Sequence, residues 1–159
     1  MNLFRENRTL RILLILVLII YLMLLSYFLF FASLPGRGGL PEGYAGINLV
    51  PFAEILRYVN KWSEVGMAYA MLNIVGNIVC FIPMGIIFPL LFKRMEKLYR
   101  ATVLGLAISI CVETVQLVSG VGVFDIDDII LNTVGAAAGY GIFAASRALN
   151  RKKCRSCDD

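Results

Sequence analysis

The feature that most constrains this chain is a set of four long apolar runs. They cover residues 12–31, 67–92, 101–118 and 129–149. About 20 apolar residues are enough to cross the hydrocarbon core of a bilayer. The first run is too long for the apolar part of a signal peptide and is interpreted as a retained span. The sequence therefore predicts an all-α integral membrane protein, built as a bundle of four transmembrane helices.

The composition of the 159-residue chain agrees with this class. The chain is 59% hydrophobic and 16% charged, which is typical of membrane proteins and not of soluble domains. Its net charge of +4 does not indicate a nucleic-acid partner, because the basic residues gather at the ends of the apolar runs. We expect membrane lipids as partners and no nucleic acid. The chain has no histidine, so it lacks the most common general base and metal ligand.

The basic residues predict the orientation of the chain. Residues 1–11, 93–100 and 147–155 hold most of the Lys and Arg residues. The exceptions are Arg37, Arg57 and Lys61. Because cytoplasmic loops are enriched in Lys and Arg, both termini are predicted to lie in the cytoplasm. We expect a cytoplasmic tail over residues 1–11, a four-span domain over 12–149 and a basic cytoplasmic tail over 150–159.

Three of the four runs contain polar side chains that a lipid-facing helix should not carry. They are Asn73 and Asn77 in the second run, Glu113 and Gln116 in the third, and Asp128 and Asn132 at the start of the fourth. Within each pair the spacing of three or four residues puts both side chains on one helix face. An ionisable side chain at membrane depth costs a few kcal/mol or more and usually faces a bundle interior or a wet cavity. With the predicted orientation all six lie toward the outer leaflet, which indicates one shared site.

Glu113 points most strongly to a function, because the neighbouring turns of its own helix offer no cation. It is therefore protonated, hydrated, paired with Arg57 or bound to a ligand. Asn73 and Asn77 are less informative, since interhelical hydrogen bonds are as good an explanation as ligand contact.

Three aspartates mark the start of the fourth run. Asp125 and Asp127 are expected to cap its helix or to be solvated, whereas Asp128 stands between capping and ligand contact. The D-I-D-D run is only a weak sign of a divalent metal, so no metal ligands are assigned. Cys154 and Cys157 form half of a zinc motif at best and are expected to be free thiols.

Two further patterns concern packing. Within residues 48–64, Phe52, Ile55 and Leu56 share one face, which predicts a short amphipathic helix on the outer membrane surface or a lid on the bundle. Gly135 and Gly139 have a small-x-x-x-small spacing in line with Asn132, which predicts close approach of a neighbouring helix.

Four sequence blocks resemble the VanZ-like family of small bacterial membrane proteins. They are Asn48-Leu-Val-Pro-Phe52, Asn73-Ile-Val-Gly-Asn77 with the following Phe81-Ile-Pro-Met-Gly85, Glu113-Thr-Val-Gln116, and Asp125-Ile-Asp-Asp-Ile-Ile-Leu-Asn132-Thr-Val-Gly135. The resemblance covers about residues 47 to 145. The positions that match family motifs are Asn48, Pro51, Asn77, Pro83, Glu113, Gln116, Asp128, Asn132 and Gly135. An arginine that often precedes the aspartates in the family is missing here, where the loop reads Gly120-Val-Gly-Val-Phe124.

The resemblance implies a multi-pass protein of the bacterial cell membrane with a role in the cell envelope. The founding type of the family is associated with resistance to teicoplanin, so a link to glycopeptide resistance is expected. The leading hypothesis is a protein that binds an amphiphilic ligand, either a lipoglycopeptide antibiotic or a lipid-linked wall precursor. The candidate ligand-binding residues are Asn48, Asn73, Asn77, Glu113, Gln116, Asp125, Asp128 and Asn132. Two alternatives are a membrane enzyme with Glu113 and Asp128 as acid/base or metal site, and a non-catalytic assembly partner of cell-wall proteins.

Overall fold

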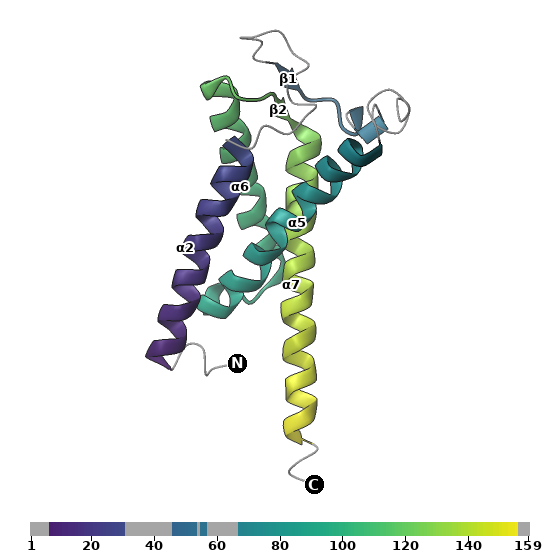
Figure 1. Cartoon of the computed structure of the whole chain (residues 1–159). Helices are drawn as coiled ribbons and strands as arrows, with labels where there is room; N and C mark the ends of the chain where they lie inside the picture. Colours follow the sequence, from purple (N-terminus) through teal and green to yellow (C-terminus); the bar gives the residue numbers. More distant parts are fainter. Residues whose placement is uncertain (1–6, 31–45, 54, 57–66, 156–159) are drawn as a thin grey trace.

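The computed structural model describes residues 7–30, 46–53, 55–56 and 67–155. Four long helices dominate it: α2 (Arg8–Phe30), α5 (Met67–Leu91), α6 (Leu98–Ser119) and α7 (Ile126–Arg155). A 3-10 turn, η2 (Lys93–Met95), joins α5 to α6, and two short strands, β1 (Ile47–Asn48) and β2 (Phe124–Asp125), lie together at one end of the bundle (Figure 1).

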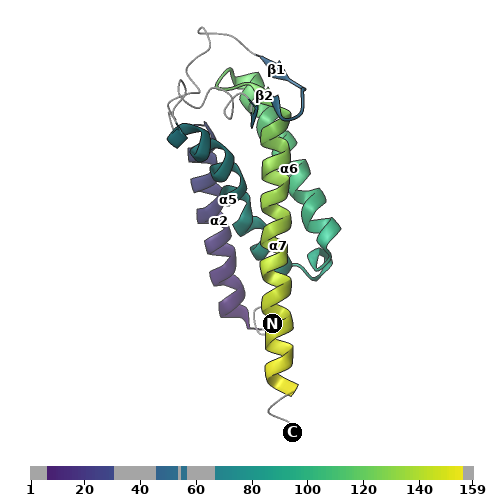
Figure 2. The same cartoon turned by 90° about the vertical axis from the view of Figure 1, so that its right-hand side faces the viewer.

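All four helices are long and apolar enough to cross a membrane. The qualifying segments are Arg8–Phe28, Met71–Leu91, Leu98–Ser119 and Ile126–Asn150. This confirms the predicted all-α four-helix membrane class. Helix α7 has 30 residues and is therefore about 45 Å long, which exceeds the ~30 Å hydrocarbon core. Figure 2 shows its far end extending beyond the other three helices.

Helix α7 packs most extensively on α5, which is also the helix that packs on both α2 and α6. The contact depends on glycines, as the small-x-x-x-small spacing predicted. A Cβ atom on Gly135 would lie 2.2 Å from the Ile78 carbonyl oxygen, and one on Gly139 would lie 2.1 Å from the Ile82 carbonyl oxygen. Only hydrogen atoms fit in such a space, so these positions set how closely the two helices approach.

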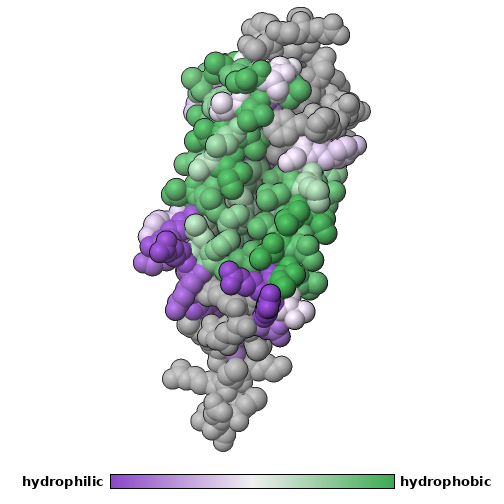
Figure 3. All heavy atoms as spheres, turned by 90° about the vertical axis from the view of Figure 1, so that its left-hand side faces the viewer, coloured by the Kyte–Doolittle hydropathy of each residue, from purple (hydrophilic) through white to green (hydrophobic). Residues whose placement is uncertain are grey.

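The two ends of the bundle differ in chemistry. At the end where α2 begins, which we call the basic end, Arg147 of α7 forms an ion pair with Glu96, and the Tyr140 hydroxyl donates to the Glu96 carbonyl at 2.8 Å. Figure 3 shows hydrophilic side chains gathered in a band at this lower end, below a predominantly hydrophobic surface. The apolar core, with Phe81, Met84 and Ala136 almost fully buried, lies between the basic end and the opposite, strand end.

The strand end holds the main departure from the sequence prediction. The helix predicted over residues 48–64 does not begin at Asn48. Instead, β1 pairs with β2 in parallel, with Ile47 opposite Phe124 and Asn48 opposite Asp125. Helical structure begins only at Ala53 and continues through residues 55–56. The rest of the predicted amphipathic helix, including Arg57, lies outside the described residues. Two-residue strands show no sequence periodicity, which is why this pairing was missed.

Candidate functional site

Helix α6 contributes one buried polar face at the strand end. Ser109, Glu113 and Gln116 are only 0–3% exposed. Their spacing of four and three residues aligns them on the side of α6 that packs against α7. Glu113 is thus fully enclosed, as its position in an apolar run predicted.

Asp125 joins three elements around this face. Its Oδ1 accepts the Asp127 backbone amide at 2.8 Å, which is the N-cap bond predicted for the fourth helix. Its Oδ2 accepts the Asn48 side-chain amide of β1 at 3.2 Å. Its own backbone amide donates to Glu113 Oε2 at 3.1 Å. Asp125 therefore connects β1, α6 and the start of α7 through a single residue.

The Asp127 carboxylate has hydrogen-bond partners that the sequence did not predict. It was expected to cap α7 or to be solvated, yet it is only 1% exposed and its carboxylate points to the segment after β1. Oδ1 accepts the Phe52 backbone amide at 2.5 Å, and Oδ2 accepts the Ile55 backbone amide at 3.3 Å. Asp127 therefore caps the helical turn that begins at Ala53, not its own helix.

Two amide side chains connect the helices below the aspartates. Asn77 of α5 donates to Asp128 Oδ1 of α7 at 2.5 Å. Asn132, one turn further along α7, donates through Nδ2 to the hydroxyl of Ser109 at 2.9 Å. Asn132 is 1% exposed, and its Oδ1 is a buried acceptor without a hydrogen-bond partner in the described structure. A buried acceptor of this kind costs free energy unless a donor reaches it.

We call the residues that meet here the polar cluster; its members are Asn48, Asn77, Ser109, Glu113, Gln116, Asp125, Asp127, Asp128 and Asn132. Seven of the eight sequence-predicted ligand-binding residues belong to it. The eighth, Asn73, is only half-buried, and no hydrogen bond joins its side chain to another described residue. Arg57, which pairs with Glu113 in one of the alternatives considered above, lies outside the described residues.

The predictions missed Ser109 and the role of Asp127. A serine in an apolar run is common and gives little signal by itself. The spacing of Ser109 to Glu113 and Gln116 was the signal that could have found it. The weak metal interpretation gains no support, since the described residues contain no group of three or more Cys, Asp or Glu side chains placed to hold a metal ion.

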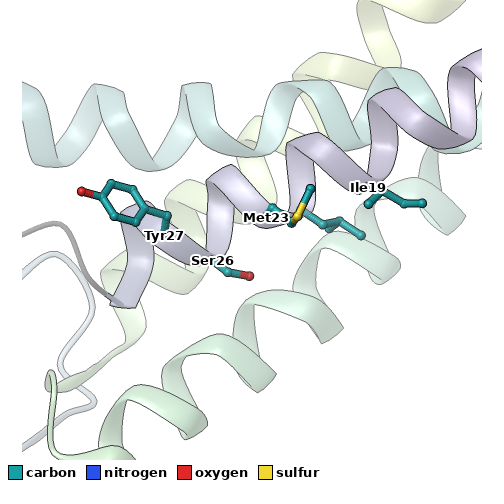
Figure 4. Close-up of a pocket in the computed structure, with 5 residues that line it drawn as sticks. Ile19, Met23, Ser26 and Tyr27 are labelled. Carbon is teal, nitrogen blue, oxygen red and sulfur yellow. The ribbon is translucent and has the colours of Figure 1, made fainter.

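A separate apolar pocket of about 440 Å³ lies along α2 (Figure 4). The described residues that line it are Ile19, Leu22, Met23, Ser26 and Tyr27. None of them belongs to the polar cluster. It is a hollow on the outer surface of a helix, since almost none of the α2 span is buried by the rest of the described chain.

Comparison with known proteins gives two matches. The family model VanZ/LLP1 matches residues 18–147. "Protein VanZ" of Enterococcus faecium is 32% identical over 82 residues, which are 51% of this chain and 50% of that protein. The match thus spans about half the length of this curated relative. No solved structure matches the chain.

Proposed function

The chain belongs to the VanZ/LLP1 family of membrane proteins, and from this premise we propose that it binds the polar head group of an amphiphilic envelope molecule at the polar cluster. The observation that carries the proposal is the Asn132 side chain, which is almost fully buried yet whose Oδ1 has no hydrogen-bond partner among the described residues. Asn132 lies on α7 with Asp128. Its Nδ2 donates to Ser109 on α6, the helix that carries Glu113. A hydroxyl or ammonium group of a ligand supplies the donor that this acceptor lacks.

The surroundings of the cluster indicate a ligand that is both polar and apolar. The cluster is enclosed by three helices whose outer faces are apolar, including the exposed Leu72, Val79 and Val115. A fully water-soluble ligand would have to leave its hydration shell for this environment, whereas a molecule with a lipid tail already resides there. A lipoglycopeptide such as teicoplanin and a lipid-linked wall precursor both have this character.

We further propose that the strand end faces the outside of a bacterial cell, where such molecules are found. This orientation agrees with the basic residues at the opposite end. Binding of a glycopeptide, or of the precursor that it targets, would lower antibiotic access to its target. A link to glycopeptide resistance is supported by the match to Protein VanZ, and it is a proposal for this chain.

Native mass spectrometry of the purified protein, with teicoplanin added as the probe, tests the binding proposal. We expect wild-type protein to retain teicoplanin or a co-purified lipid. Asn132→Leu should bind roughly two- to tenfold more weakly, which corresponds to the loss of one hydrogen bond. Val134→Leu is the matched control, because Val134 lies two residues away on α7 and is 49% exposed. Equal binding by wild type and Asn132→Leu, or no bound amphiphile at all, would overturn the proposal.

A further inference from the structure

The strand end carries a group of exposed apolar side chains that we call the apolar rim. Its members are Ile47, Leu49, Val50, Phe52, Val118 and Val121, which are between 46% and 83% exposed. They come from two segments that the β1–β2 pairing holds side by side, one around β1 and one that runs from the last turn of α6 toward β2. In a soluble protein such a group would be a large exposed patch that needs a partner.

Polar groups of the segment around β1 point the opposite way, into the protein. The Asn48 side chain and the Phe52 and Ile55 amides donate to the carboxylates of Asp125 and Asp127, which are both buried. Further backbone amides are also satisfied within the segment: Val50 donates to Asn48 Oδ1, Ala53 to the Val50 carbonyl, and Leu56 to the Phe52 carbonyl. Irregular backbone is tolerated at membrane depth only when its polar groups are satisfied inside the protein, and this segment largely meets that condition.

The depth of the rim follows from helix geometry. Arg100 of α6 and Arg147 of α7 mark the basic end, and basic side chains of this kind lie at the head-group level. At about 1.5 Å per residue, Ser119 lies ~28 Å along α6 from Arg100, and Asp128 lies ~28 Å along α7 from Arg147. The hydrocarbon core is ~30 Å thick. The far surface of the core therefore falls at the level of the rim, with Ser109, Glu113 and Asn132 of the polar cluster below it.

We propose that the apolar rim is inserted into the lipid leaflet at the strand end and that its partner is the boundary between head groups and acyl chains. The rim continues the lipid-facing surface of the helices, since Val115 on α6 is exposed below Val118. Glu113 then lies inside the hydrocarbon core, roughly 20 Å along α6 from Arg100. On the proposed function, a ligand head group that contacts Glu113 therefore reaches it from within the leaflet. Insertion of the rim itself does not depend on the proposed function.

Fluorescence quenching of single-cysteine variants in lipid nanodiscs tests the insertion. In full-length protein with Cys80, Cys111, Cys154 and Cys157 replaced, Leu49→Cys and Val50→Cys each receive an NBD label. Two matched positions calibrate the result. Val103→Cys is 58% exposed on α6 just inside the core, and Lys97→Cys is exposed at the basic end. Nanodiscs leave both membrane faces open to iodide, the aqueous quencher, and 5-doxyl lipid serves as the membrane quencher.

We expect the labels at Leu49 and Val50 to behave like the label at Val103, with stronger quenching by 5-doxyl lipid than by iodide and a blue-shifted emission. Stronger quenching by iodide than by the doxyl lipid, as expected at Lys97, would overturn the insertion. The two rim positions are adjacent, so either one decides the result if the other variant does not accumulate. Loss of teicoplanin binding in the earlier experiment would not change this readout, which keeps the two proposals separable.

Discussion

Asp127 Oδ1 accepts a hydrogen bond from the backbone amide of Phe52, 75 residues earlier in the chain. Phe52 has a φ of 65°, in the left-handed region that residues with a side chain rarely adopt. The other carboxylate oxygen accepts the Ile55 amide. A side chain at the start of α7 thus holds a turn in a conformation that the local sequence does not favour.

Replacement of Asp127 should loosen this turn in a graded way. Asp127→Ala removes both acceptors from two partly buried amide donors, at a cost below the about 1–3 kcal/mol of a fully buried donor for each. Asp127→Asn keeps one acceptor oxygen and should have the smaller effect. Hydrogen–deuterium exchange over residues 49–56 measures the result, with faster exchange in the order Ala, Asn, wild type. Equal exchange in all three proteins would show that the carboxylate does not hold the turn.

Alanine at the two contact glycines should destabilise the bundle. A Cβ on Gly135 or Gly139 would lie 2.2 or 2.1 Å from a backbone carbonyl oxygen of α5. A backbone oxygen cannot move aside as a flexible side chain can, so we expect a cost of at least about 1–3 kcal/mol. Thermal unfolding in detergent is the measurement. Gly141→Ala is the control, because a Cβ there meets nothing within 4 Å; identical melting of all three variants would contradict the close contact.

Glu113→Gln tests whether function needs the ionisable carboxyl group of Glu113 or only the shape of its side chain. Glutamine keeps an oxygen that accepts the Asp125 amide, so folding should be nearly unchanged. In a strain where the wild type raises tolerance to teicoplanin, we expect the variant to return tolerance to the level of the empty vector. Full activity of Glu113→Gln would rule out acid/base and cation-binding roles for this residue.

Glu113→Leu provides the comparison for stability. It leaves the Asp125 amide without this acceptor inside the protein, so it should be less stable than Glu113→Gln by about 1–3 kcal/mol. Thermal unfolding of the two variants measures the difference. A leucine variant as stable as the glutamine variant would mean that the bond from Asp125 contributes little.

Cysteine labelling in intact cells tests the predicted orientation. With Cys80 and Cys111 replaced, we expect an impermeant maleimide to label Gly39→Cys, while Cys154 and Cys157 react only after the cells are opened. The physical reason is the excess of Lys and Arg at the end that carries both termini. External labelling of Cys154 without labelling at Gly39→Cys would invert the topology.

The helices and most of the polar cluster could be predicted because their signals are local. An apolar run of about 20 residues already identifies a span, and a carboxyl or amide inside it identifies an inward face. Gly135 and Gly139 could be assigned to a contact for the same reason, since their spacing lies within one helix.

The partners within the cluster could not be predicted, because they depend on contacts between distant segments. Nothing in the sequence says that Asn77 bonds to Asp128 while Asn73, one turn away, stays half-buried. That difference follows from where α5 crosses α7. Asp127 likewise has the sequence context of a helix cap, and only the neighbouring β1 segment redirects it to Phe52.

The bond between Asp127 and Phe52 also has a consequence for biogenesis. At a translation rate of ~5–20 residues per second, Asp127 is synthesised roughly 4–15 s after Phe52. During that interval α5 and α6 are made, while the segment around β1 lacks the Asp127 carboxylate that holds its turn. The strand end is therefore completed only after the first three spans exist, which makes the start of the fourth helix the closing step in the assembly of this end.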